Sequence, residues 1–244
     1  MIRFEHVEKT YAGGRVKAVD DLCMEIDGGK VFGFIGPNGA GKTTTIKLMT
    51  GILRPDHGEI WMDDRRMSQD PLEAKKRIGF VPDSFDMYER LTGREYLRFL
   101  ADLYAVSMAD RKARAESALE AFELTGAVDQ QIRSYSHGMK QKLQIIGAMI
   151  HRPDIWILDE PMVGLDPMSM KVLKDEMRAA CGEGRTVFFS THVLDVAERL
   201  CDEIGIIQHG RLIAKGPLET LMHDDKVSTL EDLFLNLTEK GEQA

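Results

Sequence analysis

A glycine-rich segment directly after an apolar run has the residue types and spacing to bind phosphate. The apolar run is 31–35, and the segment after it matches the pattern G-x-x-x-x-G-K-[ST]. Its residues are Gly36, Pro37, Asn38, Gly39, Ala40, Gly41, Lys42, Thr43 and Thr44. In a strand-to-helix turn, glycines let backbone N–H groups converge on phosphate oxygens, and the helix dipole adds positive charge. We expect Lys42 to reach the β- and γ-phosphates and the Thr43 hydroxyl to bind Mg²⁺.

A second apolar run, 155–158, leads into the carboxylate pair Asp159 and Glu160. Beside a phosphate loop, such a pair suits hydrolysis of a magnesium nucleotide. Asp159 would hold the hydrated Mg²⁺, and Glu160 would face the γ-phosphate and polarise the attacking water. An exposed acidic loop is the alternative, which the neighbouring phosphate loop disfavours.

The order of the apolar runs predicts the scaffold that positions these residues. Short, continuous apolar runs that end in loops are typical of buried parallel strands, and 31–35 and 155–158 are of this kind. Further strands are expected at 186–189, 204–208 and 211–214, with helical patterns between the strands. We therefore expect an α/β fold with a mostly parallel sheet and ligands at the carboxyl ends of its strands.

The middle of the chain predicts a helical subdomain at about 84–150, inserted between sheet strands. Thr92 and Glu95 have the spacing of a capping box. Apolar residues follow at helical spacing: Tyr96, Leu97, Leu100, Leu103 and Tyr104. A second helix is expected at 109–124.

Near the end of the chain, Ser228 and Glu231 have the spacing of another capping box, which predicts a short helix at about 229–238. An apolar stripe at i, i+3, i+4 and i+7 marks one face of it. Its residues are Leu230, Leu233, Phe234 and Leu237. We expect this stripe to pack on its own domain and not on a partner.

Composition narrows the class of protein. The 244 residues are 43% hydrophobic and 30% charged, as in globular chains that bury a substantial core. Because 40 acidic residues outnumber 32 Lys and Arg, the formal net charge is −8. This balance argues against a general nucleic-acid surface, so no nucleic-acid partner is expected.

The cysteines and the apolar runs indicate where the chain works. Cys23, Cys181 and Cys201 are odd in number and lack CxxC spacing, so we interpret them as small core residues in a reducing compartment. No apolar run approaches the roughly 20 residues of a membrane-spanning helix. The first residues also lack the pattern of a secretory signal, which favours the cytoplasm.

These motifs resemble those of the ATP-binding subunits of ABC transporters, over nearly the whole chain. Residues 135–139, Tyr-Ser-His-Gly-Met, are similar to the signature motif in the form common among subunits that pair with ABC-2-type membrane proteins. The motif departs from the commonest form, LSGGQ, at three of five positions and keeps Ser136 and Gly138. At a helix N-terminus, this hydroxyl and this glycine suit a γ-phosphate. The resemblance implies that the phosphate belongs to ATP held by the other subunit.

The resemblance assigns three further residues. Tyr11 stands where the family has an aromatic side chain that stacks on adenine, although an ordinary surface tyrosine is the alternative. The segment 164–166, which ends in Asp166, resembles the loop through which two subunits sense each other. His192 resembles the switch histidine that contacts the γ-phosphate, whereas a lone histidine after a strand is more often structural. The segment 18–29 resembles the family's early β segment, which is antiparallel.

One position departs from the family. Where the family commonly has Gln after the strand at 78–81, this chain has Asp83. An aspartate can still bind Mg²⁺ or water, but it adds negative charge beside a triphosphate. By resemblance, the segment 84–91 faces the membrane subunit, and packing within the helical subdomain is the competing explanation.

Together these features predict a subunit that binds and hydrolyses ATP with Mg²⁺ and powers transport, in the direction of export. Its partners would be separate ABC-2-type transmembrane permease subunits and a second copy of itself, with which ATP closes a dimer. It would then lie in the cytoplasm, attached to the inner face of the membrane through the permease. An ABC-type ATPase that serves a soluble complex, such as iron-sulfur cluster assembly, is the alternative. A different phosphate-loop class, a GTPase or small-molecule kinase, and an inactive interaction module are less consistent with the motifs.

Overall fold

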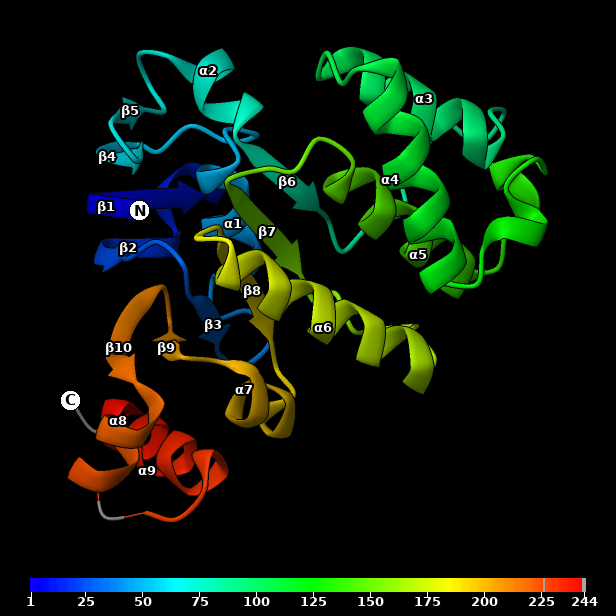
Figure 1. Cartoon of the computed structure of the whole chain (residues 1–244). Coiled ribbons are helices and arrows are strands. Elements are labelled where there is room, and N and C mark those ends of the chain that lie inside the picture. The colour runs from blue at the N-terminus through cyan, green and yellow to red at the C-terminus, as the bar shows by residue number, and fades with distance from the viewer. Residues whose placement is uncertain (226, 243–244) are drawn as a thin grey trace.

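The computed structural model describes residues 1–225 and 227–242 and contains two sheets with helices around them (Figure 1). The strands are β1 (Ile2–Tyr11), β2 (Val16–Ile26), β3 (Val31–Ile35), β4 (His57–Met62), β5 (Arg65–Arg66), β6 (Ile78–Val81), β7 (Ile155–Asp159), β8 (Thr186–Thr191), β9 (Glu203–Gln208) and β10 (Arg211–Pro217). The helices are α1 (Lys42–Met49), α2 (Pro71–Lys76), α3 (Gly93–Leu103), α4 (Met108–Ala121), α5 (His137–Met149), α6 (Pro167–Gly182), α7 (Leu194–Leu200), α8 (Leu218–Asp224) and α9 (Leu230–Glu242). Three short 3₁₀ turns lie at Ala12–Gly14, Thr125–Ala127 and Ile132–Ser134.

The larger sheet has the strand order β10-β9-β3-β8-β7-β6, and only β10 runs antiparallel to its neighbour. Every residue of β3, β7, β8 and β9 is buried, because helices or the second sheet cover both faces. β3 lies between β9 and β8, which places its carboxyl end, and the loop that follows, in the middle of the sheet. The predicted mostly parallel sheet is confirmed.

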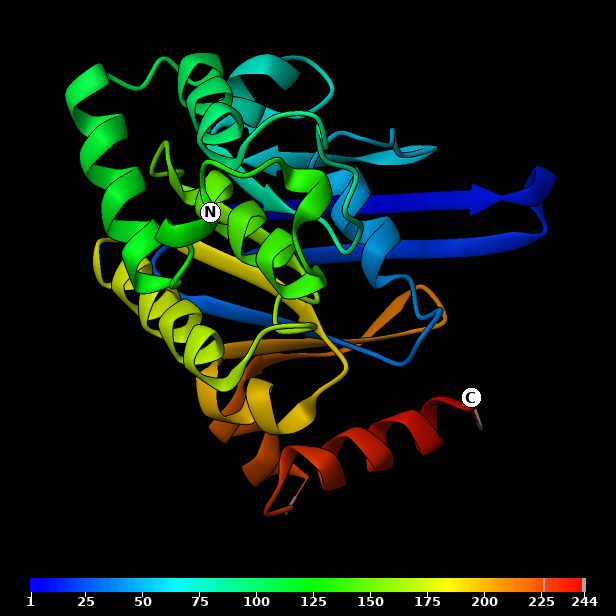
Figure 2. The ribbon, with the colours of Figure 1, turned by 90° about the vertical axis from the view of Figure 1, so that its right-hand side faces the viewer.

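The second sheet, β2-β1-β4-β5, is antiparallel and forms the N-terminal part of the chain. Its inner face packs with α1 on the larger sheet, in a core that includes Ile2, Leu22 and Ile60. Phe188 stacks on Phe32 in this core, with ring centroids 5.6 Å apart. The long hairpin of β1 and β2 projects beyond this core (Figure 2). The expected early antiparallel segment is thus confirmed.

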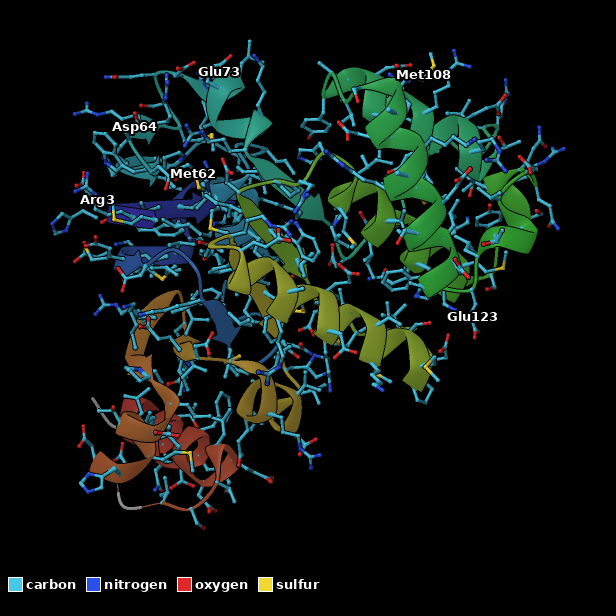
Figure 3. The ribbon with its side chains drawn as sticks, in the orientation of Figure 1. Arg3, Met62, Asp64, Glu73, Met108 and Glu123 are labelled. Atoms are coloured by element: carbon cyan, nitrogen blue, oxygen red, sulfur yellow. The ribbon has the colours of Figure 1, made fainter. Side chains whose placement is uncertain are left out.

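Helices α3, α4 and α5 share a core that continues onto the face of the larger sheet. The capping box of α3 is present: the Thr92 hydroxyl accepts from Glu95 N, and the Glu95 carboxylate accepts from Thr92 N at 2.8 Å. The predicted helix 109–124 was wrong at its end, because α4 stops at Ala121 and Phe122 turns into the core with no exposure. At the other end of α4, Met108 is 80% exposed (Figure 3).

Some residues of the segment 84–91 pack within the chain, and others are exposed where a membrane subunit could contact them. Met87 and Leu91 are half-buried against the core of α3–α5, as the packing explanation expects. Tyr88 is instead 62% exposed and meets the ring of Phe99 edge-on. Contact of this segment with a membrane subunit stays a prediction.

Helix α9 is longer than expected and begins differently. It extends to Glu242, and its first turn is capped by Thr229, whose hydroxyl accepts from Asp232 N at 3.1 Å. The predicted capping box of Ser228 and Glu231 was therefore wrong by one residue. The apolar stripe does pack on its own domain: Leu230 and Leu233 are fully buried in a core with α7, β9 and α8. Phe234 and Leu237 pack against the same core.

The three cysteines differ in their surroundings. Cys181 and Cys201 are half-buried and pack against core residues. Cys23 is exposed on β2, so its interpretation as a core residue was wrong. Within the described part of the chain, every helix is too short or too polar to cross a membrane.

Candidate nucleotide-binding and hydrolysis site

The phosphate loop, 36–41, connects β3 to α1 and is fixed from behind by strand β2 and by the β9–β10 turn. Gly41 adopts φ +112°, and a Cβ there would lie 2.3 Å from the Ala18 carbonyl oxygen, so only glycine fits. The Gly210 N–H donates to the Ala40 carbonyl at 2.9 Å and ties the loop to the β9–β10 turn. The loop is therefore held in place by β2 and by the turn after β9.

Lys42 begins α1 and folds back under the loop, with its side chain only 7% exposed. Its ammonium donates to the Gly36 carbonyl at 2.7 Å and to the Pro37 carbonyl at 3.2 Å. Burial lowers the pKa of Lys42, and the nearby charges of Glu160 and Asp159 oppose that shift. The ammonium group of Lys42 thus places a positive charge beneath the phosphate loop, beside the carboxylate pair.

Asp159 ends β7 and is almost completely buried. Its Oδ1 accepts from the Ser190 hydroxyl at 2.5 Å, and its carboxylate also hydrogen-bonds with the Thr43 side chain. Burial raises the pKa of Asp159, and these two hydrogen bonds oppose the rise. A buried carboxylate beside a threonine hydroxyl is the hard oxygen donor set that Mg²⁺ prefers, so the residues predicted to hold this ion fit it.

Asp83 follows β6, at the same edge of the sheet, and is exposed. Its charge contributes to raising the pKa of Asp159, as does the charge of Glu160. Three carboxylates therefore share this edge with Lys42. A bound divalent cation would relieve their mutual repulsion.

Glu160 and His192 meet one residue beyond the ends of β7 and β8. Glu160 adopts φ +48°, a left-handed backbone that turns the chain sharply after the strand. Its Oε1 lies 2.9 Å from His192 Nδ1 and 3.9 Å from Lys42 Nζ. The structure thus brings together the two residues that the sequence predicts to be catalytic.

Ser190 is the residue at this site that the sequence analysis missed. Its hydroxyl donates to Asp159 Oδ1 and accepts from Glu160 N at 3.0 Å, so one side chain orients both members of the carboxylate pair. Ser190 is the partner of Asp159 in the parallel register of β7 and β8. Ser190 interrupts the apolar run of β8, and this polar residue in a buried strand was the sequence signal that could have identified it.

The signature residues lie elsewhere. Ser136 caps α5, where its hydroxyl accepts from Met139 N at 3.3 Å, and it is exposed. Gly138 packs so closely on the next loop that a Cβ would lie 2.8 Å from the Gly164 carbonyl oxygen. Figure 1 shows α5 beside α3 and α4, well separated from α1. Ser136 and Gly138 therefore do not join the phosphate loop of their own chain.

Two further predicted residues, Tyr11 and Asp166, have their described contacts with residues other than the carboxylate pair. Tyr11 lies at the tip of the β1–β2 hairpin, opposite Val16, and is 40% exposed. Asp166 caps α6: it accepts from Ser169 N at 2.8 Å and pairs with Lys142 at 2.8 Å. These contacts hold the pKa of Asp166 well below its usual range. Contact of Tyr11 and Asp166 with nucleotide stays a prediction.

A parallel sheet with a glycine-rich loop, a lysine below it and a buried Asp beside it defines the chain as a phosphate-loop nucleoside triphosphatase. The family model of ABC transporters matches residues 19–163, more than half of the chain. The chain therefore belongs to the ABC transporter family, as an ATP-binding and ATP-hydrolysing subunit. Subunits of this family dimerise and work with transmembrane subunits.

Relatives and solved structures agree with this assignment. The ABC transporter ATP-binding protein NatA of Bacillus subtilis (strain 168) is 34% identical over 227 residues, 93% of this chain and 92% of the relative. The linearmycin resistance ATP-binding protein LnrL of the same organism is 36% identical over 216 residues, 88% of this chain and 69% of the relative. The solved ATP-binding subunit of an ABC transporter has a TM-score of 0.93 and 32% identity, covering 98% of this chain and 99% of that one. A dimeric cassette bound to ADP and Pi has a TM-score of 0.78 and 28% identity, covering 89% of this chain and 99% of that one.

Proposed function

We propose that this chain powers export through separate ABC-2-type transmembrane permease subunits, by closing with a second copy of itself around Mg²⁺-ATP. The observation that carries the proposal is the division of the site. Lys42, Asp159, Glu160 and His192 are assembled at one edge of the sheet, whereas Ser136 lies exposed on a different surface of the same chain. A two-fold pair lets each surface complete the other.

The phosphate-loop side supplies the chemistry. When ATP binds, Lys42 exchanges the Gly36 and Pro37 carbonyls for phosphate oxygens, which its buried position favours because competing water is scarce there. Thr43 and Asp159 would hold Mg²⁺, which neutralises charge on the phosphates. Glu160 accepts a proton from the attacking water, and its contact with His192 Nδ1 keeps the carboxylate turned toward the γ-phosphate.

The signature side supplies closure. The exposed N-terminus of α5 presents the Ser136 hydroxyl and the helix dipole, and both favour an incoming phosphate. ATP bound on one subunit would thus join it to Ser136 and Gly138 of the other. Loss of the γ-phosphate after hydrolysis removes that contact and lets the pair open, which transmits motion to the membrane subunits.

The direction of transport and the membrane attachment rest on the relatives. One is a linearmycin resistance ATP-binding protein and another is a Nod factor export ATP-binding protein. The second name states export, and the first states resistance to a compound, for which export is one route. We propose that the chain lies on the cytoplasmic face of the membrane, bound to its permease. Its excess of acidic residues argues against a nucleic-acid partner.

Light scattering coupled to size exclusion tests the composite site. Glu160→Gln keeps the shape of the side chain but removes the base, so ATP and Mg²⁺ should convert this variant from monomer to dimer. Lys42→Ala, which lacks the buried cation, is the matched control and should remain monomeric. A Glu160→Gln variant that binds ATP yet stays monomeric would contradict closure by two copies of this chain.

A further inference from the structure

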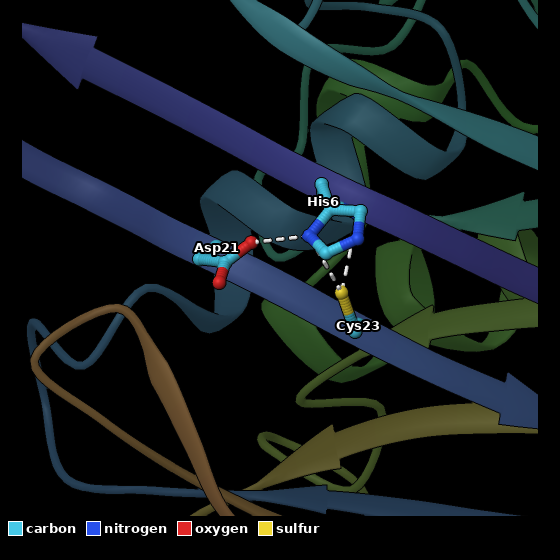
Figure 4. Close-up of side chains that lie close together, drawn as sticks. All are labelled: His6, Asp21 and Cys23. Carbon is cyan, nitrogen blue, oxygen red and sulfur yellow. Dashed lines mark hydrogen bonds and ion pairs between the residues drawn. The ribbon is translucent and has the colours of Figure 1, made fainter.

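His6, Asp21 and Cys23 form a cluster on the exposed side of the β1–β2 hairpin (Figure 4). His6 Nδ1 lies 2.8 Å from Asp21 Oδ1 and 3.4 Å from Cys23 Sγ. One potential ligand atom from each of the three residues lies within 4.8 Å of the others. None of the three takes part in the nucleotide site described above.

Irregular backbone brings these side chains together. The pairing of β1 with β2 shifts between Phe4 and Val7, which marks a bulge at His6. His6 adopts φ +49° and Asp21 adopts φ +51°, left-handed conformations that histidine and aspartate adopt more readily than most residues other than glycine. Bulges commonly redirect a side chain next to a functional site. Here the Asp21 carboxylate and the Cys23 sulfur both contact the His6 ring.

The geometry distinguishes a cation site from a proton relay. A Cys–His–Asp relay uses the two ring nitrogens separately, one for the thiol and one for the carboxylate. In this cluster the Asp21 oxygen and the Cys23 sulfur both approach Nδ1. One ligand atom from each residue lies within 4.8 Å of the other two, a spacing that one shared metal ion requires.

The distances suit a tetrahedral ion. Around Zn²⁺, nitrogen and oxygen ligands lie about 3.4 Å apart, and nitrogen and sulfur ligands about 3.5 Å apart. The His6–Cys23 distance of 3.4 Å already agrees, and the His6–Asp21 distance of 2.8 Å needs to open by about half an ångström. Both side chains are more than half exposed, at 80% for His6 and 61% for Asp21, so this adjustment is easy.

The charged residues near the cluster pair with one another and do not compete for His6, Asp21 and Cys23. Asp21 and Cys23 line a hollow of about 340 Å³, together with Asp20 and Arg211. Asp20 is already occupied, because it pairs with Lys17 at 2.6 Å and with Arg211 at 2.7 Å. Asp21 instead has the His6 ring as its partner.

We propose that His6, Asp21 and Cys23 bind a borderline-soft divalent cation of the Zn²⁺ class. A thiolate, an imidazole and a carboxylate select such an ion over Mg²⁺ and Ca²⁺, which prefer oxygen ligands. The three protein ligands leave the fourth tetrahedral position to water or to a ligand from outside the chain. The ion also links β1 to β2 below the hairpin tip that carries Tyr11.

Titration with Co²⁺, without nucleotide and with a non-thiol reductant, tests this site. Thiolate ligation gives Co²⁺ an intense ligand-to-metal charge-transfer absorption, and we expect it to saturate at one equivalent and to be displaced by Zn²⁺. Cys23→Ser should abolish the band, and His6→Asn, which tolerates the positive φ, should weaken binding at least tenfold. Binding should also be weaker at pH 6 than at pH 8, because ligands must lose protons.

Cys181→Ala is the matched control, since it removes a thiol elsewhere and should leave the band unchanged. Absence of a thiolate band in the unmodified protein would overturn the proposal, as would a band that survives in Cys23→Ser. Circular dichroism of both Cys23→Ser and His6→Asn establishes that each variant is folded. A band that disappears in folded Cys23→Ser and persists in Cys181→Ala supports the site.

Discussion

The carboxyl edge of the central sheet and the N-terminus of α5 both present groups for a phosphate, but they are built differently. At the sheet edge, Asp159 is buried and Ser190 hydrogen-bonds to both carboxylate residues. At the N-terminus of α5, Ser136 is exposed. Within the described part of the chain, its hydroxyl hydrogen-bonds only to the backbone of its own helix. One region is assembled within the chain, and the other awaits a partner.

This difference separates two kinds of residue in the proposed cycle. Groups at the sheet edge should act on chemistry and on ATP binding by each subunit. Groups at α5 should act on closure, with ATP binding by the single subunit unaffected. The following predictions test that separation, from the largest expected effect to the smallest.

Glu160→Gln should lower the rate of ATP hydrolysis by about 10²-fold or more, because the general base is lost. ATP affinity, measured by fluorescence titration, should change little. The exposed Glu73→Gln in α2 is a control for loss of a carboxylate and should keep full turnover. Near-normal turnover by Glu160→Gln would refute the role assigned to this residue.

Ser136→Ala should lower both hydrolysis and ATP-dependent dimerisation by about tenfold, since one charge-assisted hydrogen bond to phosphate is lost. The affinity of the single subunit for ATP should be unchanged. Ser107→Ala is a matched control: Ser107 caps α4 as Ser136 caps α5, and each variant loses a helix cap worth about 1 kcal/mol. Equal effects of the two substitutions on dimerisation would remove the special role of α5.

His151 lies where the amino end of β6 meets the end of α3, away from both regions, and should make this contact sensitive to acid. Its Nε2 hydrogen-bonds with the Ile78 carbonyl at 3.1 Å, and its ring stacks on Tyr104 at the end of α3. Burial lowers the pKa of His151 to about 4, below its ordinary value of 6.5. As the pH falls below about 6.5, the unfolded chain takes up a proton before the folded chain does, so stability is lost.

Between pH 6.5 and 5.5 this residue should cost about 1 kcal/mol of the free energy of unfolding, measured by urea titration. His151→Gln should flatten this part of the pH dependence by that amount. His223→Gln, at a histidine that is 89% exposed, is the control. An identical pH dependence in His151→Gln and the unmodified protein would contradict the assignment.

Asp83→Asn tests whether the exposed Asp83 belongs to the magnesium site at the sheet edge. If Asp83 helps to hold Mg²⁺, the concentration of Mg²⁺ for half-maximal hydrolysis should rise about threefold in this variant, a loss of under 1 kcal/mol typical of an exposed charge. Asp86→Asn, at an exposed position in the same loop, should leave it unchanged. An unaltered Mg²⁺ titration in Asp83→Asn would make Asp83 a structural residue.

Much of the scaffold follows from local pattern. Strand 78–81 and strand 31–35 have the bounds that their apolar runs predict, because strands buried on both faces leave no polar interruption. Other bounds were wrong: β8 and β10 extend two and three residues beyond the predicted 189 and 214, and helices α4 and α9 also differ at their ends. Phe122 turns into the core and ends α4, and Thr229 caps α9 although its neighbour Ser228 could also do so. Such choices depend on tertiary packing, which local spacing does not contain.

The sequence by itself determined the phosphate loop, the carboxylate pair and most of the buried strands, because each depends on residues that are close along the chain. Only the tertiary structure decided which distant residues meet. The strand register places Ser190 beside Asp159, although 31 residues separate them. A bulge in the first hairpin brings His6 to Cys23, which local pattern had assigned to the core. Both contacts arise from strand pairing, whose register is set by the packing of whole sheets.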